Sequence, residues 1–215
     1  MIPVAEAIQR ITDAFDPLTA ETVSLAEASG RVLAEDVLAR TTQPPFDVSA
    51  MDGYAVRAQD LTQAPTTLKQ VGAVPAGQHF EGEVGAGETV RIFTGSRVPS
   101  GADTVVMQEN TTTDGKQITI VKVPNKGQFI RAGGLDFRAG EIGLKAGQRL
   151  TPRAIGYAAS MNHPWLTVRR KPRVAILATG DEIVMPGDPI GANQIVSSNS
   201  HALAAAVQSY GGEPF

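Results

Sequence analysis

Four glycine-flanked bends in this sequence carry oxygen-bearing side chains next to expected strands. They are Asp52-Gly53, Thr94-Gly95, Gly134-Leu135-Asp136 and Thr179-Gly180-Asp181-Glu182. Carboxylates on loops are hard ligands of the kind that Mg²⁺ prefers, usually together with substrate phosphates and water. Threonine hydroxyls and backbone amides beside glycine suit an oxyanion such as phosphate. Each bend alone would be an ordinary turn, but the four together indicate a site for an anionic ligand and a divalent cation.

The stretch from Pro44 to Val56 contains the first of these bends. Its two adjacent prolines restrict the backbone and disfavour helix in the residues before them. Asp52-Gly53 is predicted to turn, because Asp tolerates unusual dihedral angles and Gly permits positive φ. Residues 54–56 are predicted to form the strand that leaves the turn. The pattern therefore presents the carboxylate of Asp52 on a tight bend.

The composition is typical of a globular protein, and 215 residues are enough for one or two domains with their own cores. Gly (22) and Pro (14) are frequent and aromatic residues make up only 5%, which favours short strands and turns over long helices. The net charge of −3 provides no global positive field for a nucleic acid. The absence of cysteine excludes disulfides, thiolate metal sites and a cysteine nucleophile.

Several other chemistries lack support in the sequence. His79, His163 and His201 are scattered and do not have metal-ligand spacing. The sequence has no P-loop, no G-x-S-x-G elbow and no G-x-G-x-x-G fingerprint. The apolar runs are far shorter than a membrane span, and Glu6 lies where a signal peptide would be cationic or apolar. We therefore expect a cytoplasmic protein with no membrane or nucleic-acid partner.

The first half of the chain is predicted to be one amphipathic helix followed by mostly β structure. The helix is expected over residues 3–15, and its apolar face needs another surface to cover it. Asp114-Gly115 between alternating residues is a strong hairpin signal. Residues 22–25 and 32–34 are two short apolar pieces separated by a possible helical turn. Strands are expected around Val71 and Val74, and at residues 90–93, 104–107, 111–113 and 117–123.

The second half is predicted to begin with a helix from Pro152 to about Ser160, capped by Thr151. The basic run at residues 169–173 marks a boundary, interpreted as a solvated linker with a phosphate-steering patch as the alternative. Residues 174–178 are uniformly apolar, as a parallel strand buried on both faces should be. Asp181 and Glu182 follow this strand, at the end where open α/β sheets bind ligands.

A last helix is expected over residues 202–210, capped by Asn199 or Ser200 and ended by the glycine pair at 211–212. Strand, loop, helix and glycine stop are the start of a doubly wound α/β domain. One strand and one helix cannot form a parallel sheet that is covered on both faces. We therefore expect either a piece of a longer protein or a segment that leans on another surface.

These residues resemble the molybdopterin molybdenumtransferases, and the gephyrin E domain is similar. The longest matching block runs from Pro44 to Val56. The likeness extends over essentially the whole chain and corresponds to the N-terminal half of these enzymes. The other blocks are Arg91–Gly95 with Val98-Pro99, residues 101–109, residues 172–182, and Gln194-Ile195 with Asn199.

The resemblance implies a mixed α and β fold with an elongated, β-rich N-terminal region over residues 1–168. In that region a β lobe, about residues 46–137, is inserted between residues 23–45 and 138–168, and the helix of residues 3–15 returns to the α/β domain. Residues 169–215 would be the incomplete start of a doubly wound, molybdopterin-binding α/β domain. A homodimer is implied, with the preceding enzyme, molybdopterin adenylyltransferase, as a second expected partner.

The resemblance also implies the reaction: Mg²⁺-dependent cleavage of adenylylated molybdopterin, in which molybdate is inserted and AMP is released. By motif position, Asp52, Asp136 and Glu182 would be the catalytic residues and the metal ligands. The substrate-binding residues would be Thr94, Gly95, Thr179, Gly180, Asp181 and Asn199. Leu135 departs from the acidic residue usual before Asp136, and the family's later blocks are missing, so this chain alone is expected to be inactive.

Two other interpretations remain open at the level of the sequence. The first is a non-catalytic, dimerising scaffold module derived from the same family. The second is an unrelated β-rich protein that binds a carbohydrate or a nucleotide. The enzyme and the scaffold differ in whether AMP is released, and the unrelated binder would keep the four bends far apart.

Overall fold

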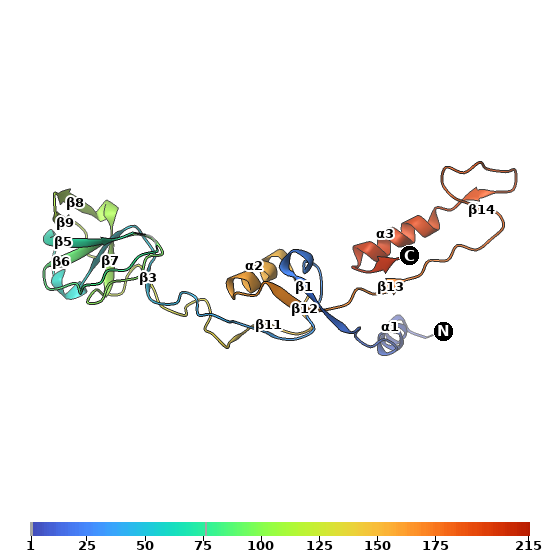
Figure 1. Cartoon of the computed structure of the whole chain (residues 1–215), viewed down its shortest axis with the longest axis horizontal. Helices are drawn as coiled ribbons and strands as arrows, with labels where there is room; N and C mark the ends of the chain where they lie inside the picture. Colours follow the sequence, from blue (N-terminus) through green and yellow to red (C-terminus); the bar gives the residue numbers. More distant parts are fainter. Residues whose placement is uncertain (1, 76) are drawn as a thin grey trace. The chain divides into compact units, whose positions relative to one another are not determined.

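The computed structural model describes residues 2–75 and 77–215. Contacts between Cα atoms divide the chain into two compact units, of which unit 1 comprises Met1–Leu38 and Ile142–Phe215 and unit 2 comprises Ala39–Glu141. Within the described residues, unit 2 is β structure with short 3₁₀ turns and unit 1 combines α-helices with short strands, which together confirm the predicted mixed class (Figure 1). The predicted domain boundary near residue 168 stays a prediction.

Unit 2 is built on one six-stranded sheet with the strand order β7-β4-β6-β5-β9-β8. The hairpin predicted at Asp114-Gly115 is confirmed as β8–β9, although its second strand ends at Ile120 rather than residue 123. Neighbouring strands run antiparallel except β5 and β6, which are parallel. The strands are β4 (Gly53–Val56), β5 (Thr66–Val74), β6 (Glu88–Ile92), β7 (Thr104–Met107), β8 (Thr111–Asp114) and β9 (Gln117–Ile120).

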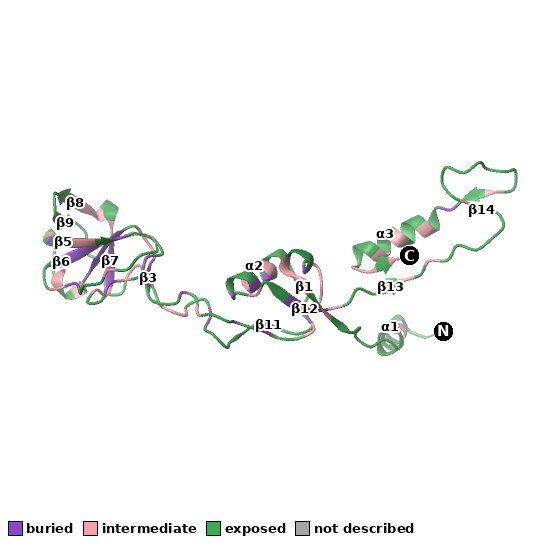
Figure 2. Ribbon diagram, in the orientation of Figure 1, coloured by how far each residue is buried: buried purple, intermediate pink, exposed green. Residues whose placement is uncertain are grey.

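Strand β4 lies inside the sheet, and all four of its residues are buried. Figure 2 shows buried residues gathered in the strands of unit 2. Successive side chains of a strand point to opposite faces, and β4 accordingly contributes to two apolar clusters. Tyr54 and Val56 pack with Leu68, Val106, Ile118 and other residues on one face. Ala55 packs with Ile92 and Val105 on the other. This double burial fixes the position of the bend that precedes β4.

The bend at Asp52-Gly53 is confirmed, but the predicted reason for its glycine is wrong. Gly53 does not have positive φ and already belongs to β4. A Cβ atom on Gly53 would lie 1.9 Å from the carbonyl oxygen of Val106 on β7. Glycine is needed here because two backbones approach closely, a constraint that acts across the sheet rather than within the turn.

Short elements outside the sheet brace this region of unit 2. Strand β3 (Val48–Ser49) pairs antiparallel with β10 (Ile130–Arg131), and Val48 also forms a bridge with Arg97. Two 3₁₀ turns, η2 (Ala58–Asp60) and η3 (Gln108–Asn110), follow β4 and β7. The segment before β4 is therefore tied to the loop after β6.

Unit 1 contains the antiparallel pair β1 (Ala20–Ser24) and β12 (Trp165–Arg169), and β2 (Val37–Leu38) pairs with β11 (Ile142–Leu144). The 3₁₀ turn η1 (Leu25–Glu27) follows β1. The helix predicted from Pro152 is confirmed as α2 (Pro152–Ser160), and Thr151 Oγ1 accepts a hydrogen bond from Ala154 N at 3.2 Å. The short apolar piece at residues 32–34 forms isolated bridges, and its Leu33 is buried.

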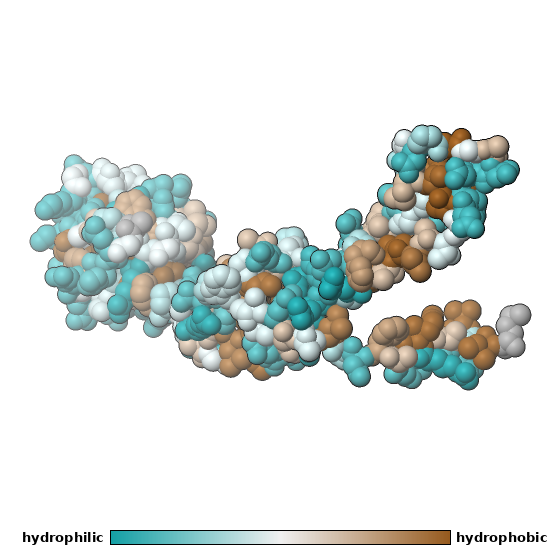
Figure 3. Space-filling view, turned by 45° about the vertical axis from the view of Figure 1, so that its right-hand side comes forward, coloured by the Kyte–Doolittle hydropathy of each residue, from teal (hydrophilic) through white to brown (hydrophobic). Residues whose placement is uncertain are grey.

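The predicted N-terminal helix is confirmed as α1 (Val4–Asp13). An ion pair between Arg10 and Glu6, 2.6 Å apart and one turn away, lies on its polar side. None of its residues is buried, and Figure 3 shows its apolar side chains gathered along one side. The large exposed residues of this segment are Val4, Ile8, Ile11 and Phe15. The covering surface that the sequence calls for is not supplied by the described residues.

The last part of unit 1 has the expected strand, helix and strand, but not the expected burial. Strand β13 (Arg173–Val174) is parallel to β16 (Glu213–Pro214), with α3 (Asn199–Ser209) between them. The apolar run 174–178 was predicted to be a buried strand, which is wrong in this chain, since only its first residue lies in β13 and Leu177 is 86% exposed. A parallel strand is covered only when further strands and helices flank it.

Two further details of this part differ from the sequence prediction. Helix α3 begins at Asn199 after Ser198, whose side chain makes no capping hydrogen bond, so neither Asn199 nor Ser200 is the cap. Gly211 has φ +87° just after the helix, as expected of a glycine stop. The sequence did not indicate the parallel pair β14 (Ile183–Val184) and β15 (Ile195–Val196). No helix within the described part of the chain is long and apolar enough to cross a membrane.

Candidate functional site

Two of the predicted site residues of unit 2 are in direct contact. Asp52 Oδ1 accepts two hydrogen bonds from Thr94, one from its backbone N and one from Oγ1, both at 2.8 Å. Both residues are exposed, so the pair faces solvent. The two donors meet a single carboxylate oxygen, which leaves Oδ2 as the oxygen that can bind a cation or a water molecule.

Pairing between strands brings these residues together. Asp52 immediately precedes β4, and Thr94 is the second residue after the end of β6. Gly53, the first residue of β4, is paired with Ile92, the last residue of β6, in the antiparallel register. The loop carrying Thr94 closes through a hydrogen bond from Ser96 N to Phe93 O at 3.0 Å. It is tied to β3 by Gly95 N to Ser49 O at 2.8 Å. The carboxylate and its donors are thus held by two neighbouring strands and a braced loop.

The surroundings of Asp52 favour its ionised form. The backbone N–H of Thr94 has the largest effect in lowering the pKa of the Asp52 carboxyl below its ordinary value, followed by the Thr94 hydroxyl, with a smaller contribution from the charge of Arg91. Desolvation, which outweighs the contribution of Arg91 but not that of Thr94, opposes these effects. Asp52 is therefore an anion at neutral pH, as a metal ligand or a water-orienting group must be.

We predict that Thr94→Val raises the pKa of Asp52 towards, but not up to, its ordinary value, because the hydroxyl bond is lost and the backbone bond is kept. Because the pKa of Asp52 is lowered in the folded state, ionised Asp52 stabilises the fold at pH values above its ordinary pKa. This contribution to stability disappears as the pH falls through the lowered pKa. The difference in stability between parent and variant should therefore be present at neutral pH and shrink in acid. Carboxyl ¹³C NMR titration gives the pKa directly.

A matched control for this titration is Thr119→Val. Thr119 is a threonine of β9 whose hydroxyl bonds to that of Thr67, 2.9 Å away. We expect this variant to leave the pKa of Asp52 unchanged. An identical Asp52 titration in the parent and in Thr94→Val would contradict the hydrogen-bond account.

Asp136, the third predicted site residue of unit 2, has a different partner. Both of its carboxylate oxygens lie 2.9 Å from Arg131 Nη2. Its backbone N donates to Gln43 O at 2.9 Å, and Gly134 N donates to Pro44 O at 2.8 Å. The loop of Asp136 therefore packs on the proline-rich segment. Within residues 2–75 and 77–215, no three His, Asp or Glu side chains are grouped as a metal centre, so the metal role of Asp136 stays a prediction.

The donors expected to bind an oxyanion near Thr94 are used within the protein. The amides of Thr94, Gly95 and Ser96 donate to Asp52, Ser49 and Phe93, respectively. In this arrangement Thr94 orients the carboxylate of Asp52. Substrate binding by Thr94 and Gly95 stays a prediction.

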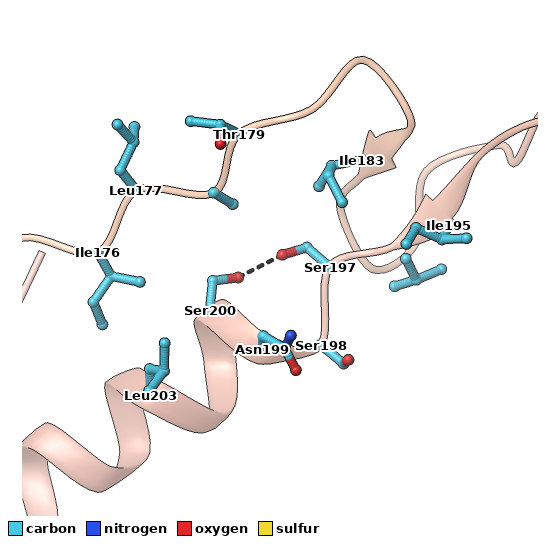
Figure 4. A pocket seen from close by; sticks show the side chains of 12 residues that line it. Ile176, Leu177, Thr179, Ile183, Ile195, Ser197, Ser198, Asn199, Ser200 and Leu203 are labelled. Atoms are coloured by element: carbon cyan, nitrogen blue, oxygen red, sulfur yellow. Dashed lines mark hydrogen bonds between the residues drawn. The ribbon is translucent and has the colours of Figure 1, made fainter. Parts of the chain in front are cut away.

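The remaining predicted residues belong to unit 1. Thr179 and Asn199 lie on opposite sides of a cavity of about 320 Å³, and Ser197 Oγ and Ser200 Oγ at its edge are 2.5 Å apart (Figure 4). The floor of this cavity is apolar and includes Ile176, Ile183 and Leu203. A mostly apolar lining with a few polar groups is typical of pockets that bind small molecules.

The acidic bend of unit 1 adjoins this cavity. The carboxylate of Glu182 folds over Gly180, where a Cβ atom would lie 2.4 Å from Oε2. Gly180 has φ +137°, and its carbonyl oxygen accepts a hydrogen bond from Ile183 N at 3.1 Å. Asp181 lies within this turn. The ligand-binding roles of Gly180, Asp181 and Glu182 stay predictions, as does the shared site expected of residues from both units.

Sequence reasoning missed the cations beside these acids. Arg91 lies next to the pair of Asp52 and Thr94, and Arg131 binds Asp136. Arg91 lies in a sequence block that carries the resemblance and inside the strand expected at residues 90–93, so a charged residue within a strand was the available signal there, whereas Arg131 lies outside those blocks and strands. Local pattern could not show which acid each arginine faces, because that depends on how the strands pair.

Comparison with known proteins agrees with this architecture. Residues 2–162 match the family model described as MoeA N-terminal region (domain I and II). A molybdopterin molybdenumtransferase from Nostoc sp. is 42% identical over 90% of this chain and 45% of its own length. One from Staphylococcus aureus (strain Mu50) is 36% identical over 99% of this chain and 52% of its own length.

The solved structures give the same result. The molybdopterin biosynthesis MoeA protein from Pyrococcus horikoshii OT3 superposes with a TM-score of 0.92 at 36% identity, over 100% of this chain and 59% of that one. The chain spans about half the length of the curated relatives it matches. With the family model covering most of the sequence, the chain belongs to the MoeA N-terminal family.

Proposed function

We propose that this chain forms part of a molybdopterin molybdenumtransferase, which inserts molybdate into adenylylated molybdopterin and releases AMP in molybdenum cofactor biosynthesis. The observation that carries the proposal is the exposed, ionised Asp52 held by Thr94, inside the region that matches the family. Relatives named for this transferase activity support it.

The residues present fit a Mg²⁺ ion in part. Mg²⁺ is usually held by one or two carboxylates, with substrate phosphates and water completing an octahedron. Asp52 suits this role because both Thr94 donors bond to Oδ1 rather than Oδ2 and the group is ionised. Asp136 does not suit it in this conformation, since Arg131 binds both of its oxygens. When bound, the ion would neutralise the charge of the phosphoanhydride.

The protein groups then have separate tasks. Thr94 fixes the orientation of the Asp52 carboxylate through two donors on one oxygen. The carboxylate would hold the cation through its negative charge and would orient a water molecule for cleavage of the phosphoanhydride. Such preorganisation costs no rearrangement at the moment of reaction. Glu182 is proposed to act on the same substrate, and the cavity beside Thr179 and Asn199 to receive its pterin.

The proposal is tested with the complete gene product that contains these residues. We expect AMP release from adenylylated molybdopterin only when molybdate and a divalent cation are both present, measured by chromatography of the nucleotide. The proposed partners are a second copy of the chain and molybdopterin adenylyltransferase, and light scattering on the same sample tests the dimer. AMP release at an equal rate without molybdate would show a plain hydrolase and reject the proposal.

A further inference from the structure

We propose that Arg91 is a positioning residue for Asp52 and Thr94, which it holds in place by clamping the two chain segments that carry them. The inference rests on the proposed function only for its effect on rate. The geometry that supports it lies entirely within unit 2.

Arg91 contacts two aromatic rings whose residues lie close in sequence to Asp52 and Thr94. On β6 it is paired with Tyr54 of β4, and its guanidinium carbon is 5.0 Å from the ring centroids of both Tyr54 and Phe93. Tyr54 follows Asp52 by two residues, and Phe93 immediately precedes Thr94. Arginine over an aromatic face is attracted by the ring quadrupole. One side chain therefore contacts both segments that present the hydrogen-bonded pair.

Hydrogen bonds extend this clamp to the bend itself. Arg91 Nη2 donates to Gln108 Oε1 at 2.5 Å, and Gln108 N donates to the carbonyl oxygen of Asp52 at 3.1 Å. Arg91 Nη1 also reaches the carbonyl oxygen of Gly53 at 3.4 Å, a longer contact. The chain of contacts runs from Arg91 through Gln108 to Asp52, and from Asp52 through Thr94 back to the ring beside Arg91.

The simpler alternative is an arginine that only stabilises the sheet. Such residues usually pair with a carboxylate, as Arg57 does with Asp60 at 3.6 Å. Among the described residues, Arg91 forms no salt bridge within 4.0 Å, and it donates hydrogen bonds to the neutral oxygens of Gln108 and Gly53. Its half-buried charge therefore acts on Asp52 through space. This arrangement uses the planar guanidinium of arginine and its several fixed donors, which lysine cannot supply.

The test reads the Thr94 amide by NMR in the 215-residue chain, with Arg91→Met, Arg91→Lys and the matched control Arg57→Met. We expect hydrogen-exchange protection of the Thr94 amide to fall about tenfold in Arg91→Met, because the bond to Asp52 opens more often. Arg91→Lys should recover little of it, and Arg57→Met should leave it unchanged. Full protection in Arg91→Lys would show that charge alone suffices and would overturn the proposal, as would unchanged protection in Arg91→Met.

A second variant covers the case in which Arg91→Met does not fold. Gln108 is exposed in η3 and outside the apolar clusters, so Gln108→Ala should fold. Hydrogen-exchange protection of the Thr94 amide should also fall in this variant, but by less than in Arg91→Met. Unchanged protection of the Thr94 amide in Gln108→Ala would show that Gln108 does not transmit the effect of Arg91 to Asp52, and would contradict the proposal.

Rates in the complete gene product give the functional readout. We expect kcat to fall about tenfold to a hundredfold in Arg91→Met while KM changes less than about threefold, since a positioning defect acts on the transition state. A rise in KM at constant kcat would instead mark Arg91 as a substrate-binding group and overturn the proposal. If the parent protein releases no AMP, the proposed function fails, whereas the Thr94 amide still decides whether Arg91 positions the pair.

Discussion

Replacing Asp52 with asparagine is expected to slow molybdate-dependent AMP release in the complete gene product by about 100-fold or more, the usual cost of losing one preorganised charged or polar group at a reacting centre. Asparagine has the same shape, and its amide oxygen can still accept both hydrogen bonds from Thr94. The substitution therefore removes the negative charge and leaves the geometry. An effect of this size on a residue that is exposed, and outside the core, would separate catalysis from stability.

Two measurements accompany this rate. The half-saturating Mg²⁺ concentration should rise in Asp52→Asn, because one charged oxygen ligand is lost. The control is Asp114→Asn at the tip of the β8–β9 hairpin, where asparagine before glycine suits the turn equally well. It should retain parental activity. Activity within about twofold of the parent in Asp52→Asn would withdraw Asp52 from the reacting centre.

The bends that present the candidate site could be read from the sequence, but their partners could not. Turn chemistry is partly local: the bend after Thr94 uses a glycine with positive φ, Gly95 at +82°, as glycine beside a turn predicts. The contact between Thr94 and Asp52 depends on β4 pairing with β6 in one particular register. Pairing between strands far apart in sequence is a tertiary property that periodicity does not encode. For the same reason the two arginines that face the acids were missed.

The errors of the sequence prediction have a common physical origin. Residues 174–178 have the composition of a fully covered strand, yet only neighbouring strands and helices can cover them, and Leu177 remains exposed. The parallel pairing of β5 with β6 inside an otherwise antiparallel sheet has no local signature either. For Gly53 the prediction assumed positive φ within the turn, whereas glycine is required there by the close approach of β7. Local sequence signals thus located the helices and strands, whereas tertiary packing determined the burial and the contacts of each residue.

Substituting alanine for Gly53 is expected to destabilise unit 2 by about 3 kcal/mol, the upper part of the range for overpacking a closely packed site. The added Cβ atom would lie 1.9 Å from Val106 O, 2.9 Å from Val106 C and 3.1 Å from Met107 Cα. All three atoms are backbone, so no side-chain rotation can relieve the contact. Strands β4 and β7 must separate, which disturbs both apolar clusters and the bend that carries Asp52.

The measurement for Gly53→Ala is urea unfolding followed by the NMR amide signals of β4 and β7. The single tryptophan, Trp165, belongs to unit 1, so its fluorescence provides an internal reference that should not change. The matched control is Gly115→Ala in the hairpin turn, where φ is +58° and no atom lies within 4 Å of the added Cβ. That variant should lose only about 1 kcal/mol, the cost of a left-handed backbone for alanine. Equal losses in the two variants would contradict the close-approach account, because conformational preference alone would then explain both.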